Sequence, residues 1–217
     1  METDDFSLQE KWVEVLQPFR VDETIARQVF ADLIARYGED GRYYHNGHHI
    51  LNVLQAVESL QELATNYTAV RLAAWFHDVI YHMRPAATEA SNEEKSADYA
   101  AEILRVMNIP TETVLLVHQL ICATQLNYPT PNDPNFYVLL DADLATLAAD
   151  CAQYDQYAQA IRREFAFVPD DLYRNGRSQI LQSFLDRERI FLTDKMFNEK
   201  EANARLNIQR ELDSLWS

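Results

Sequence analysis

Histidine and aspartate residues occupy positions in this sequence where an inward helix face calls for apolar side chains. In the helix expected from about Asn46, His49 borders the apolar stripe and His48 lies on the polar face. In the next apolar helix His77 occupies an inward position, and Asp78 follows it with a rotation of about 100°. Imidazole nitrogens and carboxylate oxygens on the inward faces of neighbouring helices are suitable ligands for a divalent metal ion.

A third helix carries acidic residues in an otherwise apolar run. The segment 136–149 reads FYVLLDADLATLAA, in which Asp141, Asp143 and Thr146 are the polar residues. A buried carboxylate without a partner is costly, so such a position implies a cation, a metal ion or a protonated acid. We take Asp141 as the ligand from this helix and keep Asp143 in reserve. The predicted metal ligands are His49, His77, Asp78 and Asp141.

Two imidazoles with two carboxylates suit one first-row divalent ion, and they favour Mn, Fe, Co, Ni or Zn over Mg alone. Each residue taken alone has an ordinary alternative: a satisfied core histidine, or an aspartate that pairs with an arginine or caps a helix. His118 also lies on an inward face, where it could serve a second ion or pack as a structural histidine.

Composition restricts the fold and the partners. Of 217 residues only 4 are Gly and 47% are hydrophobic, which disfavours hairpin-rich all-β folds and a disordered acidic chain. The 19 basic and 34 acidic side chains give a net charge of −15, which argues against a nucleic-acid polymer or an anionic membrane as a partner. A small phosphorylated molecule remains compatible, provided that a local basic pocket receives it.

Helix breakers and capping residues divide the chain into segments of helical length. Asp22 precedes one such segment, and Ser91 with Glu94 forms a capping box before another. We predict an all-α fold: one compact domain over 1–217, a bundle of about nine to eleven helices with a helical C-terminal extension from about residue 150. Cys122 and Cys151 form no CxxC motif, the N-terminus is acidic and no apolar run is long enough to cross a bilayer, so we expect a cytoplasmic protein. A homodimer remains open.

The order of these candidate ligands resembles the H…HD…D signature of the HD superfamily of metal-dependent phosphohydrolases. The local sequence is similar to one branch of it, the bacterial predicted HD-superfamily phosphohydrolases, over nearly the whole chain. The blocks that carry the resemblance are Arg42–Ile50, Trp75–Tyr81, Asn92–Ala97, Leu140–Leu144, Arg162–Phe165, Tyr173–Arg177 and Ala204–Asn207.

The resemblance implies an all-α HD-type fold, the four metal ligands named above and hydrolysis of a phosphoester of a small molecule, with a nucleotide as the expected substrate. The chain departs from the family pattern at Gln125-Leu126-Asn127, where relatives tend to have a basic residue and a histidine. A substrate contact or a second-metal ligand in that region would therefore be altered here.

Residues near these blocks are candidates for catalysis and for substrate binding. Besides Asp78, we expect Glu94 and Lys95 to act in catalysis, although a solvated capping turn explains this pair equally well. The expected substrate-binding residues are Arg42, Tyr44, His45 and Arg163. The ordinary alternatives are a surface ion pair for Arg163 and helix packing for the tyrosine.

Two other function classes stay open. A di-iron oxygenase of the HD type needs further histidine ligands, which only His118, His45 and His82 could supply. A catalytically idle binding module would keep the metal for stability and bind nucleotide without turnover.

Overall fold

The computed structural model describes residues 2–83, 89–126 and 129–216. The fold is all-helical, with 73% of residues in helices, ten α-helices and no strand among the described residues, which confirms the predicted fold class. Three short 3-10 helices complete the described secondary structure. The elements in chain order are α1 (Glu2–Leu16), η1 (Gln17–Phe19), α2 (Glu23–Tyr37), α3 (Gly47–Ser59), η2 (Gln61–Leu63), α4 (Tyr67–Phe76), α5 (Asn92–Val106), α6 (Thr111–Cys122), α7 (Pro134–Asp143), η3 (Leu144–Ala148), α8 (Cys151–Glu164), α9 (Asp170–Leu185) and α10 (Asp194–Leu215).

Side-chain caps start α2 and α5 where the sequence indicates. Asp22 accepts hydrogen bonds from the backbone N–H groups of Thr24 and Ile25, and Ser91 forms the predicted capping box with Glu94. These bonds satisfy N–H groups that the first helical turn leaves without partners. The cap of α3 is Asn46, whose side chain accepts from the backbone N–H groups of His48 and His49.

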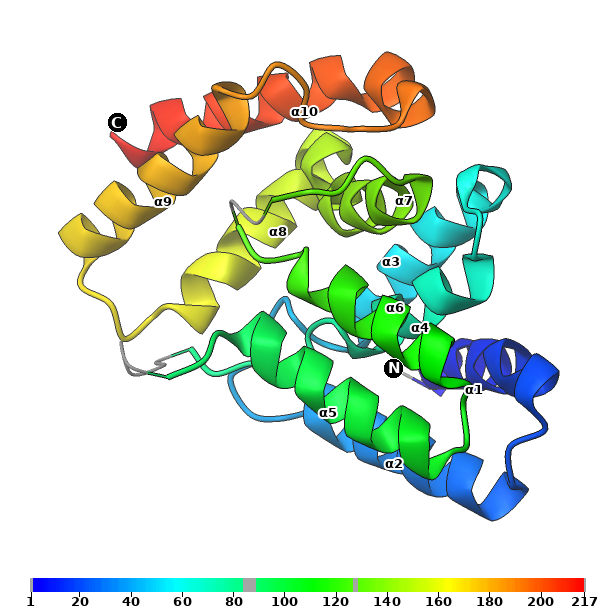
Figure 1. The fold of residues 1–217 in the computed structure, drawn as a ribbon. Coiled ribbons are helices and arrows are strands. Elements are labelled where there is room, and N and C mark those ends of the chain that lie inside the picture. Colours follow the sequence, from blue (N-terminus) through cyan, green and yellow to red (C-terminus); the bar gives the residue numbers. More distant parts are fainter. Residues whose placement is uncertain (1, 84–88, 127–128, 217) are drawn as a thin grey trace.

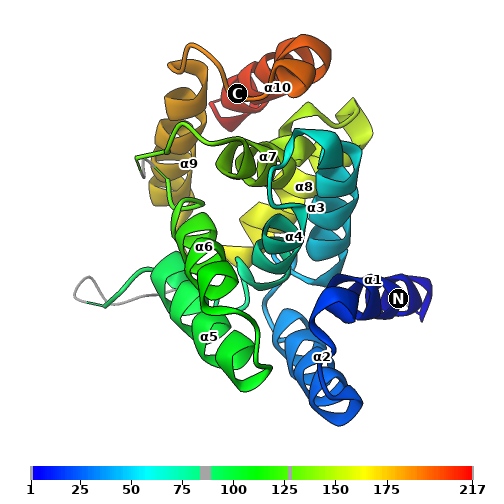
Figure 2. The ribbon, with the colours of Figure 1, turned by 45° about the vertical axis from the view of Figure 1, so that its right-hand side comes forward.

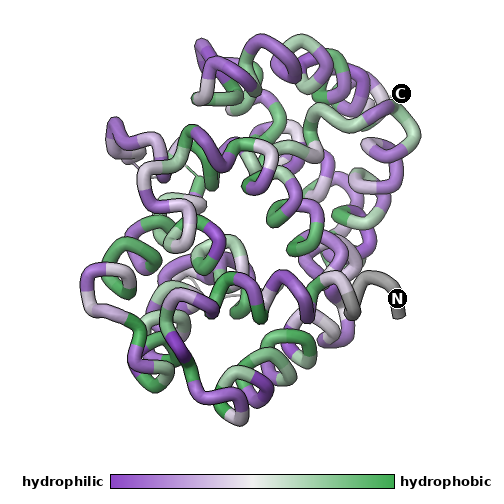
Figure 3. The backbone as a smooth tube through the Cα atoms, turned by 90° about the vertical axis from the view of Figure 1, so that its right-hand side faces the viewer, coloured by the Kyte–Doolittle hydropathy of each residue, from purple (hydrophilic) through white to green (hydrophobic). Residues whose placement is uncertain are grey.

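The helices form a compact body with α2 and α5 at one end and α9 and α10 at the other, and with α3, α4 and α7 between them (Figures 1 and 2). One hydrophobic core extends from Leu8 in α1 to Ile208 in α10. Hydrophobic and hydrophilic residues alternate along the helices (Figure 3), as expected for helices that each bury one face. None of the helices in the described ranges is long and apolar enough to cross a membrane.

Buried polar contacts join the last three helices. Arg177 of α9 donates to both carboxylate oxygens of Glu211 in α10, at 2.8 and 3.0 Å, and the Tyr154 hydroxyl of α8 donates to the same carboxylate. The extension predicted from about residue 150 thus consists of α8, α9 and α10, which a shared buried carboxylate holds together.

Trp12 should be essential for the packing of α1. Its ring is buried, lies edge-on against Trp75 at a centroid distance of 5.3 Å and donates through Nε1 to the Ala26 carbonyl. We expect Trp12→Ala to lower the free energy of unfolding by about 3–5 kcal/mol, because a large cavity and an unpaired carbonyl remain. Urea unfolding measures the loss. The neighbouring exposed Val13→Ala is the control and should change the midpoint little.

Candidate metal centre

Three helix ends bring the candidate ligands together. His49 lies in the first turn of α3, whose start Asn46 fixes by accepting from the N–H groups of His48 and His49. His77 is the residue that ends α4, and Asp78 follows it. Asp143 is the last residue of α7. Helix ends position these side chains on rigid elements, although the residues are far apart in the sequence.

The donor atoms of the cluster converge on one point. Nε2 of His49 lies 3.2 Å from Nε2 of His77, and Oδ2 of Asp78 lies 3.4 Å and 3.1 Å from these two nitrogens. Oδ1 of Asp143 lies 3.3 Å from the His49 nitrogen and 3.4 Å from the His77 nitrogen. Both histidines are buried, whereas the two aspartates retain some exposure. We call His49, His77, Asp78 and Asp143 the metal cluster.

The cluster fits a divalent metal ion. Two nitrogens each about 2.1 Å from one ion are about 3.0 Å apart at a right angle and about 3.4 Å apart at the tetrahedral angle, and the observed 3.2 Å lies between these values. Nδ1 of His77 lies 3.0 Å from the Ala74 carbonyl, which requires a proton on Nδ1 and leaves the lone pair of Nε2 for a ligand bond. One ligand atom from each of His49, His77 and Asp78 lies within 4.8 Å of the other two.

The electrostatics of the cluster also favour a cation. Burial lowers the pKa of His77, but Asp78 and Asp143 outweigh this effect and raise the pKa well above its usual value. Burial raises the pKa of Asp78, yet the charges and hydrogen bonds of the neighbouring histidines hold it well below its usual value. The two carboxylates thus stay ionised, and the field that attracts a proton here attracts a metal cation equally.

Asp141 is not part of the metal cluster, contrary to the sequence prediction. Its fully buried carboxylate accepts hydrogen bonds from the backbone N–H of Leu192 at 2.6 Å and from the N–H and hydroxyl of Thr193 at 2.8 and 2.6 Å. These three donors satisfy the carboxylate and fasten α7 to the start of α10. Asp143, two residues later and therefore turned by about 200°, faces the histidines instead.

Arg42, a predicted substrate-binding residue, has a buried side chain that is 1% exposed. The guanidinium donates to the carbonyls of His45, Asp78 and Val79, at 3.2, 2.7 and 3.0 Å. It therefore joins the loop before α3 to the turn after α4. The structure thus places Arg42 where it positions the segments that carry the metal cluster.

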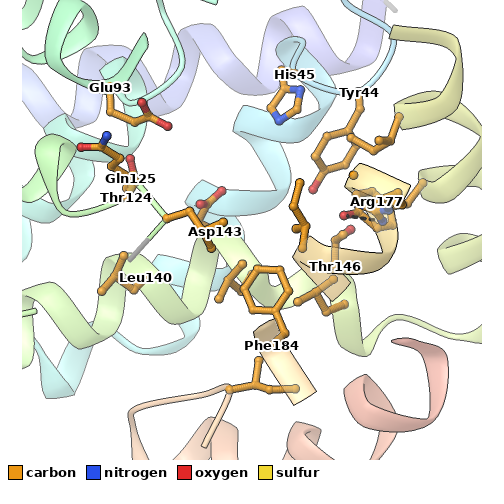
Figure 4. Close-up of a pocket in the computed structure, with 18 of the residues that line it drawn as sticks. Tyr44, His45, Glu93, Thr124, Gln125, Leu140, Asp143, Thr146, Arg177 and Phe184 are labelled. Atoms are coloured by element: carbon orange, nitrogen blue, oxygen red, sulfur yellow. Dashed lines mark hydrogen bonds between the residues drawn. The ribbon is translucent and has the colours of Figure 1, made fainter. Parts of the chain in front are cut away.

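A pocket of about 670 Å³ adjoins the metal cluster and is lined by Asp143, Tyr44 and His45. Figure 4 shows these three residues around one part of the pocket and Phe184 across from them. The predicted substrate-binding residues Tyr44 and His45 therefore lie where a bound molecule could touch them. The Tyr44 ring also packs on His49, with a centroid distance of 4.7 Å.

Glu164 is not among the residues predicted from the sequence, yet it orients His45. The buried Glu164 carboxylate accepts from the backbone N–H groups of Tyr44 and His45 through Oε1, and its Oε2 lies 2.7 Å from Nδ1 of His45. The His45 ring stacks on Tyr81 at a centroid distance of 4.1 Å. Burial raises the pKa of Glu164, but these hydrogen bonds and the His45 charge lower it below its usual value. Of the two ring nitrogens, this arrangement leaves Nε2 available to the pocket.

Three further predicted site residues lie elsewhere. Glu94 is exposed and accepts from the Ser91 N–H in the capping box, while Lys95 forms an ion pair with Glu89 at 2.5 Å. Arg163 is exposed and stacks on the Tyr43 ring, 4.0 Å from its centroid. Local contacts thus occupy the three side chains that were predicted for catalysis and substrate binding. None of the three lines the pocket.

The histidines considered for a second ion are not in the cluster either. His118 lies 3.1 Å from the exposed Asp98 and 3.7 Å from the sulfur of Cys122, and His82 is exposed. The region that departs from the family pattern does reach the pocket, since Gln125 and Leu126 line it. Asn127 lies outside the described residues.

Comparisons with known proteins give no relative: no family model, curated protein or solved structure matches the chain. The resemblance to the HD superfamily therefore stays a prediction that rests on the sequence blocks quoted above.

Variants of the two aspartates of α7 should affect metal binding and stability differently. We expect Asp143→Asn to lose most of the bound metal at little cost in stability, because it removes a partly exposed ligand. Asp141→Asn should keep the metal but unfold at a lower temperature. We expect its free energy of unfolding to fall by about 1–3 kcal/mol, because the NH₂ group of asparagine replaces one of the two oxygens that accept from the buried N–H groups of Leu192 and Thr193. Metal analysis and thermal unfolding of both variants check this. Metal loss in Asp141→Asn with retention in Asp143→Asn would reverse the assignment.

Proposed function

We propose that the chain is a metal-dependent phosphohydrolase that cleaves a phosphoester of a small molecule. The observation that carries the proposal is the convergence of His49, His77, Asp78 and Asp143 beside a pocket of about 670 Å³. The order of these residues along the chain supports it further, because it resembles the signature of the HD superfamily once Asp143 takes the place of Asp141.

The four residues of the metal cluster would hold one divalent ion, with ligand positions left for other groups. When bound, such an ion lowers the pKa of a water molecule and withdraws charge from a phosphoryl group. The chain's own contribution is to direct the Nε2 lone pair of His77 toward the site, through the contact of Nδ1 with the Ala74 carbonyl, and to keep both carboxylates ionised. Arg42 holds the segments that carry them in place.

His45 is suited to exchange a proton with the substrate. Glu164 fixes its Nδ1, so Nε2 faces the pocket, and His45 lies close enough to Asp78 to contribute to the lowered pKa of that carboxyl. We assign the His45 Nε2 as the group that donates a proton to the leaving oxygen. Glu164 is then a positioning residue: its carboxylate fixes the ring and accepts from Nδ1–H, so that the doubly protonated ring can give its Nε2 proton to the leaving oxygen and keep the one on Nδ1.

The size and the lining of the pocket favour a small-molecule substrate. A volume of about 670 Å³ is in the range of small-molecule sites, which span about 300–1,000 Å³. Tyr44, Tyr81 and Tyr157 add aromatic surface near the metal cluster, on which a nucleobase can stack. Nucleotides are therefore the first compounds to test.

Hydrolysis should require the metal cluster. We expect purified protein to contain about one equivalent of divalent metal, and to release phosphate from at least one member of a panel of phosphomonoesters, cyclic nucleotides and nucleoside triphosphates. A chelator or His77→Ala should abolish release, and Mn²⁺ or Co²⁺ should restore it only to the chelated wild type. His48→Ala, an exposed histidine beside His49, is the control. Tight nucleotide binding without turnover of any compound would favour a binding module instead.

His45 and Glu164 can be tested apart from the metal. His45→Gln should lower kcat by about 10²–10⁴-fold with the metal content unchanged. Glu164→Gln keeps an acceptor for the two backbone N–H groups, but its amide donates to Nδ1 and so excludes the ring form that carries a proton on both nitrogens, which is the form that can donate from Nε2. It should therefore lower kcat more than it raises KM, without loss of metal or folding. Equal effects of Glu94→Gln, in the exposed capping box, would count against this role.

A further inference from the structure

The pocket has two chemically different sides. His45, Tyr44 and Asp143 surround one side, next to the metal cluster, and Phe184 lies across the pocket from His45 (Figure 4). Between and around them the lining is mostly apolar, from α7, η3, α8 and α9. The apolar lining residues are Leu140, Leu144, Leu147, Ile161, Phe165, Val168, Leu172, Ile180 and Phe184, together with Ala123, Leu126, Ile190 and Leu192.

Arg187 lies on the Phe184 side, because its guanidinium packs over the Phe184 ring at 4.6 Å from the centroid. Three arginines line the pocket, and two of them already have acidic partners. Arg177 pairs with Glu211, and Arg189 pairs with Asp194.

No carboxylate or other hydrogen-bond acceptor among the described residues contacts the Arg187 side chain, which is half-buried. Burial lowers the pKa of its guanidinium below the usual value, and no neighbouring charge offsets the effect. A partly desolvated cation without an anion is unfavourable, and a bound anion would recover that cost.

Polar side chains of α10 fix the backbone on both sides of Arg187. Arg205 donates to the carbonyls of Leu185, Arg187 and Glu188, at 2.9, 2.7 and 3.2 Å. The Glu201 carboxylate accepts from the N–H groups of Ile190 and Phe191. Arg187 is therefore presented from a rigid turn at the end of α9, as a ligand-binding residue requires.

We propose that Arg187 is an anion subsite, and that the pocket takes an amphipathic small molecule whose acid group lies at Arg187 and whose apolar body lies along Phe184 and the leucines of α7 and η3. The acid is a carboxylate or a phosphate, both of which match the planar guanidinium. Together with the proposed function, on which this extension rests, the substrate is a phosphoester with a second acidic group. The binding itself requires no turnover.

The test measures displacement of the fluorescent probe anilinonaphthalene sulfonate from the full-length protein. The competitors are decanoate, decyl phosphate and decanol, which share an apolar chain and differ in the head group. On the wild type the two acids should compete about ten-fold better than the alcohol, as expected for charged hydrogen bonds. Arg187→Gln should remove this advantage, and Arg187→Lys should keep part of it. Arg174→Gln, the same change at an exposed position of α9, should behave like the wild type.

An advantage for only one of the two acids identifies the preferred head group and supports the subsite. Equal competition by the alcohol on the wild type, no displacement by any competitor, or an unchanged advantage in Arg187→Gln would each overturn it. Because the readout is binding, a protein that fails to hydrolyse phosphoesters but shows the expected displacement disproves the proposed function alone. Circular dichroism of each variant confirms that it is folded.

Discussion

The candidate metal centre depends on the way a single buried guanidinium joins two segments of the chain. Arg42 donates to the carbonyl of His45, before α3, and to those of Asp78 and Val79, after α4. Ordering two loops costs conformational entropy, which a charged donor with three acceptors offsets. The segments that carry both histidines and Asp78 are thereby fixed relative to one another. A mobile loop could not keep the two imidazole nitrogens at 3.1 to 3.4 Å from the two carboxylate oxygens.

Much of the fold and half of the site could be predicted from periodicity alone. His49 and His77 interrupt apolar stripes. Apolar residues that recur every 3.6 residues along a helix show which of its side chains face inward. The same reasoning could not choose between Asp141 and Asp143, since both lie in a helix that neighbours surround. The choice depends on the N–H groups of Leu192 and Thr193, about fifty residues away in sequence, which no local pattern reveals.

The role of Glu164 could not be predicted from the sequence, for a related reason. It follows Arg162 and Arg163 in a charged run that is typical of a solvated helix surface. Only the packing of α8 against the loop before α3 shows that this one residue of the run faces inward, onto Tyr44 and His45, 119 to 120 positions earlier in the sequence. Short-range motifs thus identify candidate ligands, whereas the residues that orient them come from distant contacts.

The end of α7 has a consequence for how the length of this helix can vary. One carboxylate, two residues from the end, fastens the helix to the segment before α10, and the final residue faces the two imidazoles. A single inserted or deleted residue before Asp141 would turn both side chains by about 100° and remove each from its partners at once. The spacing within α7 is therefore restricted as strictly as the chemistry of its acidic residues. Natural variants that differ in length here should therefore carry their insertions or deletions in the connections before and after α7, not within the helix.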